Sequence, residues 1–129
     1  MSLNLTPRVK EIFPFEPHFV TVAGHRMHYI DEGSGPVVLL LHGNPTWSFY
    51  YRNLIADLKS SFRVIAPDHI GCGLSDHPSD KHFNAHDRVN HLDEFIAQLG
   101  LTSFSLVMHD WGGPIGTSLA TRHVEKIER

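Results

Sequence analysis

The hydrophobic positions of the chain fall into short apolar runs separated by polar loops that contain glycine. Val37–Leu41 is an unbroken apolar run, too hydrophobic to have a solvated face, and it predicts a central strand of a parallel sheet. Phe62–Ala66 and Leu106–Met108 predict two further buried strands. Three such strands, each followed by a polar loop, already indicate a sheet with buried faces.

The first part of the chain has a different pattern. His18–Ala23 and Arg26–Asp31 predict two short strands joined at Gly24, as a hairpin of edge strands. Residues 1–17 carry three prolines and predict an extended lead-in over the surface. No repeat or linker divides the chain, so residues 1–129 are interpreted as one unit.

Two helices are predicted between the strands. Apolar residues at positions i, i+3, i+4 and i+7 form one stripe, at Tyr51, Leu54, Ile55 and Leu58. A second helix extends from a cap at Asn84 to a stop at Gly100, and its inward positions are Val89, Leu92, Phe95, Ile96 and Leu99. Alternating strands and helices predict an α/β fold, with an open, mostly parallel sheet and helices on both faces. Ligands bind at the carboxyl ends of such strands, where the glycine-bearing loops 42–47, 68–75 and 109–113 emerge.

The loop at 109–113 joins a strand directly to a helix. Gly112 and Gly113 allow close backbone approach, and Pro114 is tolerated in the first turn of a helix. The apex residue of this nucleophile-elbow pattern is Asp110, where serine is usual. A carboxylate is ionised at neutral pH, needs no base to attack, and lies where the helix dipole favours an anion. Two interpretations remain open, a nucleophile or a cap for the helix that begins at Trp111.

Composition narrows the classes of function. The chain has 129 residues, 41% hydrophobic and 19% charged, with a net charge of −3. Because no basic cluster is present, neither a nucleic-acid nor a membrane-surface partner is expected. The apolar runs are too short for a membrane span, and a single cysteine fits a reducing compartment, so a cytoplasmic location is expected. The eleven histidines are scattered without a ligand pattern, so no metal and no cofactor is predicted.

Two motifs together resemble the haloalkane dehalogenase family of the α/β-hydrolase fold. They are His42-Gly43-Asn44-Pro45-Thr46-Trp47-Ser48 and His109-Asp110-Trp111-Gly112-Gly113, and the resemblance extends from about Val20 to the end. It implies that Asp110 attacks a halogenated substrate and forms an alkyl ester that water hydrolyses. It also implies that the side chains of Asn44 and Trp111 bind the halide, and their backbone N–H groups then form an oxyanion hole.

Other residues of these loops are assigned supporting roles. His42 is expected to support its loop by hydrogen bonding, and His109 to point away from Asp110. Asp68 is expected to order its loop, and a cis peptide before Pro45 is considered.

Members of the family continue past the elbow with a helical cap, a further acid and a late histidine that activates water. The resemblance therefore predicts that residues 1–129 are the N-terminal portion of a longer hydrolase core, which forms the ester without releasing it. An epoxide hydrolase uses the same aspartate but requires acidic donors for the alkoxide, whereas the N–H donors of Asn44 suit a halide. A catalytically silent binding module on the same fold remains the alternative from another class.

Overall fold

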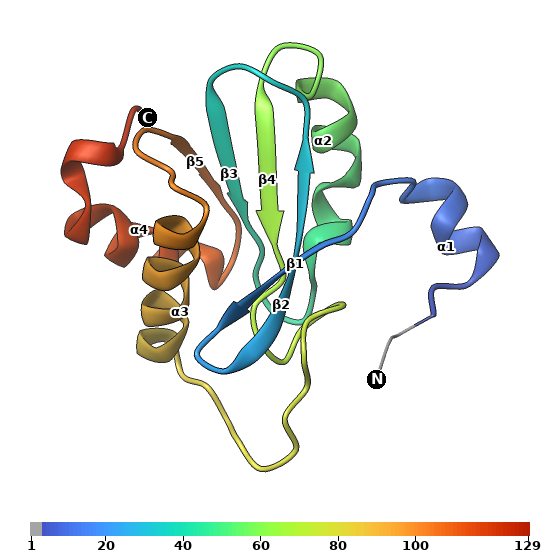
Figure 1. Ribbon diagram of the computed structural model, residues 1–129, viewed down its shortest axis with the longest axis horizontal. Helices are drawn as coiled ribbons and strands as arrows, with labels where there is room; N and C mark the ends of the chain where they lie inside the picture. The colour runs from blue at the N-terminus through green and yellow to red at the C-terminus, as the bar shows by residue number, and fades with distance from the viewer. Residues whose placement is uncertain (1–3) are drawn as a thin grey trace.

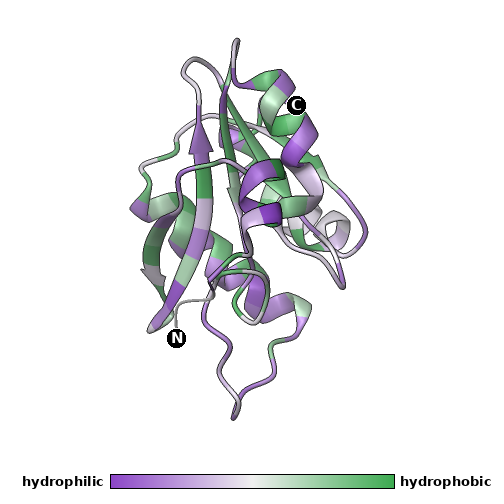
Figure 2. Cartoon of the chain, turned by 90° about the vertical axis from the view of Figure 1, so that its right-hand side faces the viewer, coloured by the Kyte–Doolittle hydropathy of each residue, from purple (hydrophilic) through white to green (hydrophobic). Residues whose placement is uncertain are grey.

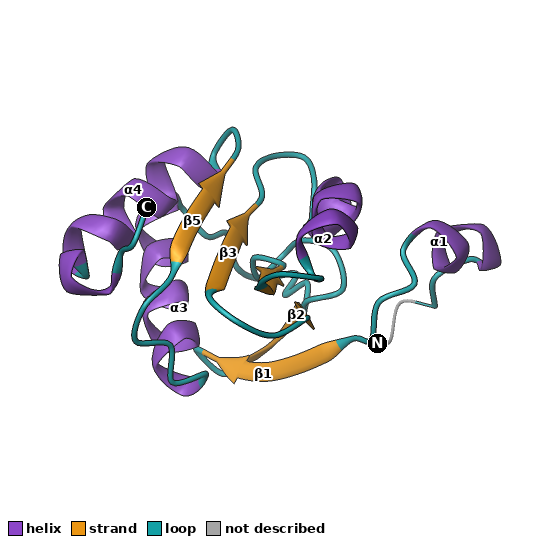
Figure 3. Ribbon diagram, turned by 90° about the horizontal axis from the view of Figure 1, so that it is seen from above, coloured by secondary structure: helices purple, strands orange, loops and turns teal. Residues whose placement is uncertain are grey.

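The computed structural model describes residues 4–129 and shows a five-stranded mixed sheet covered by helices on both faces (Figure 1, Figure 3). The strand order is β1-β2-β4-β3-β5. As predicted, β3 lies inside the sheet and pairs in parallel with both β4 and β5. The strands are β1 (His18–Val22), β2 (His25–Glu32), β3 (Val37–Leu41), β4 (Arg63–Pro67) and β5 (Ser105–Met108).

The predicted hairpin is confirmed in β1 and β2, which are antiparallel and turn at Ala23 and Gly24. The prediction that both are edge strands is wrong for β2. Its second half pairs antiparallel with β4, in a register that places Tyr29 opposite Pro67. Met27 and Ile30 are fully buried, so β2 contributes to the core and joins the hairpin to the parallel strands.

The helices divide between the two faces of the sheet (Figure 3). Leu39 and Leu41 of β3 pack in the same cluster as α3 and α4, whereas Val38 and Leu40 pack in the cluster that includes α2. This alternation follows from the two-residue period of a strand, and it buries β3 on both sides. Figure 2 shows largely hydrophobic central strands and helices striped with both kinds of residue. The helical segments are α1 (Pro7–Ile12), η1 (Ser48–Tyr51), α2 (Arg52–Leu58), α3 (Ala85–Gln98), α4 (Gly112–Arg122) and η2 (Val124–Lys126).

Both helices predicted from periodicity are present. Asn84 caps α3 as predicted, and its side chain accepts a hydrogen bond from the backbone of Asp87, whose carboxylate accepts one in return. Gly100 follows the helix with φ of 65°, a conformation that favours glycine. Within residues 4–129, no helix combines the length and apolar character needed to cross a bilayer.

The expected extended lead-in is wrong for Pro7–Ile12, which form α1; residues 1–3 of that range lie outside the described part. Thr6 caps α1 by accepting a hydrogen bond from the Val9 amide, and Pro7 occupies the first turn, where its missing N–H costs nothing. The buried Phe13 that follows packs against the ring of Trp47. This contact attaches the segment to the loop after β3.

Candidate active site

The three loops predicted to form the site meet at the carboxyl ends of β3, β4 and β5. The backbone amide of Asn44 donates to Oδ1 of Asp110 over 2.9 Å. The backbone amide of His69 donates to Nε2 of His42 over 3.0 Å. The first loop is therefore bonded to both of the others, and the predicted convergence is confirmed.

Asp110 lies at the apex of a tight turn between β5 and α4. Its φ is 53°, a left-handed conformation that is uncommon for a residue with a side chain. The amide of Gly113 donates to the Asp110 carbonyl over 2.9 Å, which closes the turn into the helix. The N-cap of α4 is Trp111, and no side chain accepts a hydrogen bond there. Asp110 therefore does not cap the helix, and that interpretation of the sequence is wrong.

Two glycines allow the loops to approach one another. A Cβ atom on Gly43 would lie 2.4 Å from the Asp110 Cβ and 2.6 Å from its Oδ1. A Cβ atom on Gly112 would lie 2.2 Å from the Leu41 carbonyl oxygen. No side chain fits at either glycine without moving these atoms. The close spacing of the loops therefore depends on glycine at positions 43 and 112.

The Asp110 carboxylate is solvent-exposed and favoured as the anion. Hydrogen bonds from the backbone N–H groups of Asn44 and Trp111 lower the pKa of Asp110 below its usual value. Asp110 also borders a shallow hollow of about 260 Å³ together with Trp111 and Pro114. The carboxylate is thus held in one orientation and remains open to approach from outside.

Asn44 and Trp111 both line a second cavity, of about 320 Å³, beside the elbow. The Trp111 side chain is 52% exposed, so its indole is not part of the core. Trp111 lines both this cavity and the hollow at Asp110, so the two spaces share one wall residue. The cis peptide considered before Pro45 is present in the structure.

His42 is fully buried and supports its loop, as predicted. Because its Nε2 accepts from the His69 amide, its Nδ1 carries the proton and donates to the Gly43 carbonyl over 2.9 Å. Burial lowers the pKa of both His42 and His69, which keeps the two imidazoles neutral. His109 is exposed and stacks on the ring of Tyr50 at 4.3 Å.

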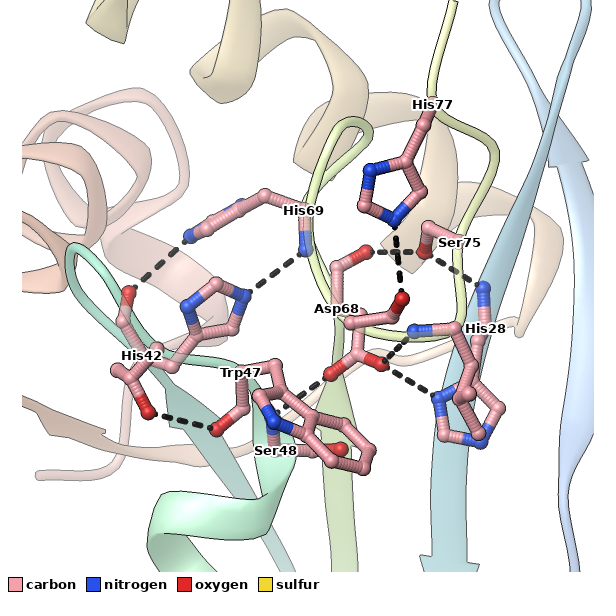
Figure 4. Close-up of polar contacts among 11 residues, drawn as sticks. His28, His42, Trp47, Ser48, Asp68, His69, Ser75 and His77 are labelled. Carbon is pink, nitrogen blue, oxygen red and sulfur yellow. Dashed lines mark hydrogen bonds and ion pairs between the residues drawn. The ribbon is translucent and has the colours of Figure 1, made fainter. Parts of the chain in front are cut away.

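Asp68 is fully buried and orders the loops as predicted (Figure 4). Its carboxylate accepts hydrogen bonds from the backbone amides of Ser48 and Leu74 and from Nδ1 of His28, at 2.7, 2.9 and 2.8 Å. The Ser75 hydroxyl donates to the Asp68 carbonyl over 2.6 Å. His28 was not predicted from the sequence, because only the pairing of β2 with β4 brings it to Asp68, whereas Ser75 lies seven residues after Asp68 in the same loop.

The carbonyl oxygen of Leu41, at the end of β3, has two donors. The Tyr51 hydroxyl donates to it over 2.9 Å, and the backbone amide of His109 donates over 3.2 Å. Tyr51 belongs to the helical segment after the first loop, and His109 opens the elbow. One carbonyl therefore joins both sides of the site.

Arg88, in the first turn of α3, also lines the cavity beside the elbow. Arg88 was not among the site residues predicted from the sequence. A basic residue in an amphipathic helix is the usual pattern of a solvated face, so no sequence signal distinguished it.

Comparisons with known proteins agree with this fold. A family model described as alpha/beta hydrolase fold matches residues 36–129. A cis-3-alkyl-4-alkyloxetan-2-one decarboxylase from Shewanella oneidensis is 46% identical over 92% of this chain and 38% of its own length. A haloalkane dehalogenase 2 from Mycobacterium tuberculosis is 41% identical over 98% of this chain and 44% of its own.

A crystal structure of an epoxide hydrolase from Vigna radiata superposes with a TM-score of 0.82 at 36% identity, over 88% of this chain and 36% of that one. The chain spans about two fifths of the length of the curated relatives described above. Because the family model matches well over half of the sequence, the chain belongs to the alpha/beta hydrolase fold family.

Proposed function

We propose that Asp110 is the nucleophile of a hydrolase that displaces halide from a haloalkane and forms an alkyl ester. The observation that carries this proposal is the position of the carboxylate, at the apex of the turn with Oδ1 held by the Asn44 amide. A lowered pKa keeps the group ionised at neutral pH, so attack requires no base. The hydrogen bond fixes the orientation of the carboxylate, which favours in-line attack on a saturated carbon.

The side chains of Asn44 and Trp111 are proposed to bind the departing halide. An indole N–H is a donor without an acceptor that would repel an anion, and a side-chain amide adds two donors. Donors that are fixed in advance where negative charge develops lower the barrier. That both residues line one cavity and flank Asp110 supports this assignment.

The backbone N–H groups of Asn44 and Trp111 are proposed to serve the second step. When water attacks the ester of Asp110, negative charge develops on its carbonyl oxygen. Hydrogen bonds from the same two groups already lower the pKa of the free carboxylate, so they are directed at the oxygens concerned. One pair of residues thereby supports both half-reactions.

Ester hydrolysis also requires a base to activate water. His42 and His69 are committed to hydrogen bonds between their loops, and His109 stacks on Tyr50. None of these three imidazoles is placed to take that role. We therefore expect residues 1–129 by themselves to form the ester faster than they release it.

The test is to incubate the protein with 1-bromohexane and follow bromide release together with the mass of the peptide that contains Asp110. Stoichiometric bromide and one hexyl group on Asp110 are expected. Asp110→Asn should abolish both, and Trp111→Phe should slow them because one N–H donor is lost. Release of bromide by Asp110→Asn at the wild-type rate would refute the proposal, and absence of any adduct would favour a silent binding module.

A second candidate follows from the 46% identity to an oxetan-2-one decarboxylase. In this reaction an Asp110 oxygen would bond to ring carbon 4 as the carbon–oxygen bond of the ring breaks, leaving its electron pair on a carboxylate. Loss of carbon dioxide would then form the alkene and return the ester electron pair to Asp110. Because no water takes part, this reaction does not depend on a base that activates water. A cis-3,4-dialkyl oxetan-2-one that yields alkene and carbon dioxide catalytically would establish it.

An epoxide is the third substrate to test, because the fold and the proposed aspartate would serve it equally. Opening an epoxide creates an alkoxide that must be protonated. Asn44 offers N–H donors, which suit a halide better than an alkoxide. Faster alkylation of Asp110 by 1,2-epoxyhexane than by 1-bromohexane would reverse this preference.

A further inference from the structure

The cavity beside the elbow brings a cationic side chain together with the two proposed anion-binding residues. Asn44 reaches it from the loop after β3, Trp111 from the start of α4, and Arg88 from the first turn of α3. Its volume of about 320 Å³ lies in the range of small-molecule sites. The elbow therefore adjoins a space that can hold part of a ligand.

The Arg88 guanidinium has no carboxylate partner among residues 4–129. The ion pairs of arginine in this part of the chain are Arg63 with Asp31 and Arg122 with Asp93. Arg88 instead donates to Sγ of Cys72 at 3.5 Å, and sulfur is a weak acceptor. A partly buried guanidinium with free donors is suited to a planar, doubly accepting anion.

The neighbouring carboxylate is already engaged. Oδ2 of Asp87 accepts the Asn84 amide at 3.0 Å as part of the α3 cap, and Asp87 forms no ion pair with Arg88 among the described residues. Among the described residues that line the cavity, Arg88 is the one with a permanent charge. The two lining imidazoles, His42 and His69, are kept neutral because burial lowers their pKa values. The cavity thus combines a cation with apolar walls such as Phe83 and Ile115.

We propose that Arg88 binds a carboxylate in this cavity and thereby selects substrates for the reaction at Asp110. This inference rests on the proposed function. The carboxylate has two possible sources, a group on the substrate remote from the reacting carbon or the leaving group of an oxetan-2-one. Both present the same two oxygens to the guanidinium.

The first arm compares 6-bromohexanoate with 1-bromohexane in one mixture, and measures the ratio of the two adducts on Asp110 by mass spectrometry. The ratio is corrected for the reaction of each compound with acetate in water. The wild type should prefer the carboxylate by about tenfold, and Arg88→Gln should reduce the ratio to near one. Arg88→Lys should retain part of the preference, because it keeps the charge without the planar fork.

The matched control is Arg8→Gln, which removes the same charge from an exposed position on α1, outside the cavity. It should leave the ratio at the wild-type value. An equal fall in Arg8→Gln and Arg88→Gln would overturn the proposal, since net charge alone would then explain the preference. An unchanged ratio in folded Arg88→Gln would exclude a carboxylate on the substrate tail as the source.

The second arm uses a cis-3,4-dialkyl oxetan-2-one. If the leaving group is the source, Arg88→Gln should slow ring opening at least tenfold relative to Arg8→Gln while the bromide ratio stays near one in both. If the substrate tail is the source, the bromide ratio should respond and the lactone rate should not. No effect of Arg88→Gln in either arm would refute carboxylate binding.

A third measurement follows equilibrium binding alone, with no variant of Arg88 and no reaction at Asp110. Hexanoate should change the tryptophan fluorescence saturably in wild type and in Asp110→Asn, whereas hexanamide should not, since Trp111 lines the cavity. Hexanoate binding without any Asp110 adduct would support the Arg88 site and refute the proposed function. If Asp110 forms an adduct but the protein shows neither a carboxylate preference nor hexanoate binding, the Arg88 site is refuted and the proposed function stands.

Discussion

The backbone amide of Asn44 donates to Oδ1 of Asp110 across 2.9 Å, linking two loops that are 66 positions apart in the sequence. This one hydrogen bond orients the exposed carboxylate and helps to lower its pKa. It depends on the close passage of the Gly43 backbone beside Asp110.

Gly43→Ala should displace the carboxylate of Asp110, because the added Cβ would lie 2.4 Å from the Asp110 Cβ. Overpacking of this kind costs about 1–3 kcal/mol in free energy of unfolding, and we expect alkylation to slow at least tenfold. Urea unfolding and the rate of Asp110 alkylation measure the two effects.

The control for this change is Gly113→Ala, in the first turn of α4. A Cβ there meets nothing within 4 Å, and alanine favours a helix over glycine by up to about 1 kcal/mol. Stability should be equal or higher, with little change in rate. If Gly113→Ala were as harmful as Gly43→Ala, close packing at Gly43 would not be the cause.

The rate of Asp110 alkylation should stay constant down to more acidic pH than for an ordinary aspartate. The Asn44 and Trp111 amides lower the pKa of Asp110 from its usual value of 3.8, so the reactive anion persists below that pH. The same hydrogen bonds stabilise the folded chain above the pKa of the unfolded state, and this contribution is lost as pH falls through the folded pKa.

A pH–rate profile with 1-bromohexane, with circular dichroism recorded at each pH, checks this expectation. The profile is used only over the range in which the chain remains folded. A half-maximal rate above pH 3.8 would contradict a lowered pKa.

Asp68→Ala should strongly destabilise the fold. It would leave His28 and the amides of Ser48 and Leu74 without their acceptor, and removing one partner of a buried polar network costs about 3–5 kcal/mol. Thermal and urea unfolding should show the loss. Asp57→Ala removes an exposed carboxylate from α2 and should change stability by no more than about 0.5 kcal/mol. Similar behaviour of the two variants would mean that Asp68 does not hold the loops.

Asn84→Ala should weaken α3 at its first turn. The side chain accepts from the Asp87 amide at 2.9 Å, and the loss of such a cap costs about 1 kcal/mol. Because α3 carries Arg88 into the cavity, amide hydrogen exchange in the first turn should also accelerate. Asn53→Ala, at an exposed position of α2, is the comparison, and equal acceleration of exchange in α3 by that variant would argue against a capping role.

The sequence predicted the parts of the fold that are determined locally. The apolar run Val37–Leu41 identified the inner strand, and Gly112 with Pro114 located the turn that places Asp110. The extended lead-in expected from the prolines is wrong, because Thr6 followed by Pro7 is also a helix start.

The remaining features depend on contacts between distant segments. The inner place of β2 follows from the pairing of Tyr29 with Pro67, which no local pattern encodes. The same pairing brings His28 to Asp68. Arg88 enters the cavity only because α3 packs beside α4. Long-range packing therefore supplied what the motifs could not predict.

The carbonyl oxygen of Leu41 accepts two hydrogen bonds, and this limits how the site can move. The Tyr51 hydroxyl and the His109 amide share this acceptor, so a shift at the end of β3 is transmitted to both rims. Neither the segment that contains Tyr51 nor the elbow that begins at His109, the two rims of the site, can widen the entrance without straining the other. Adjustment to a larger ligand is therefore expected as a concerted motion of both rims, with Leu41 as its pivot.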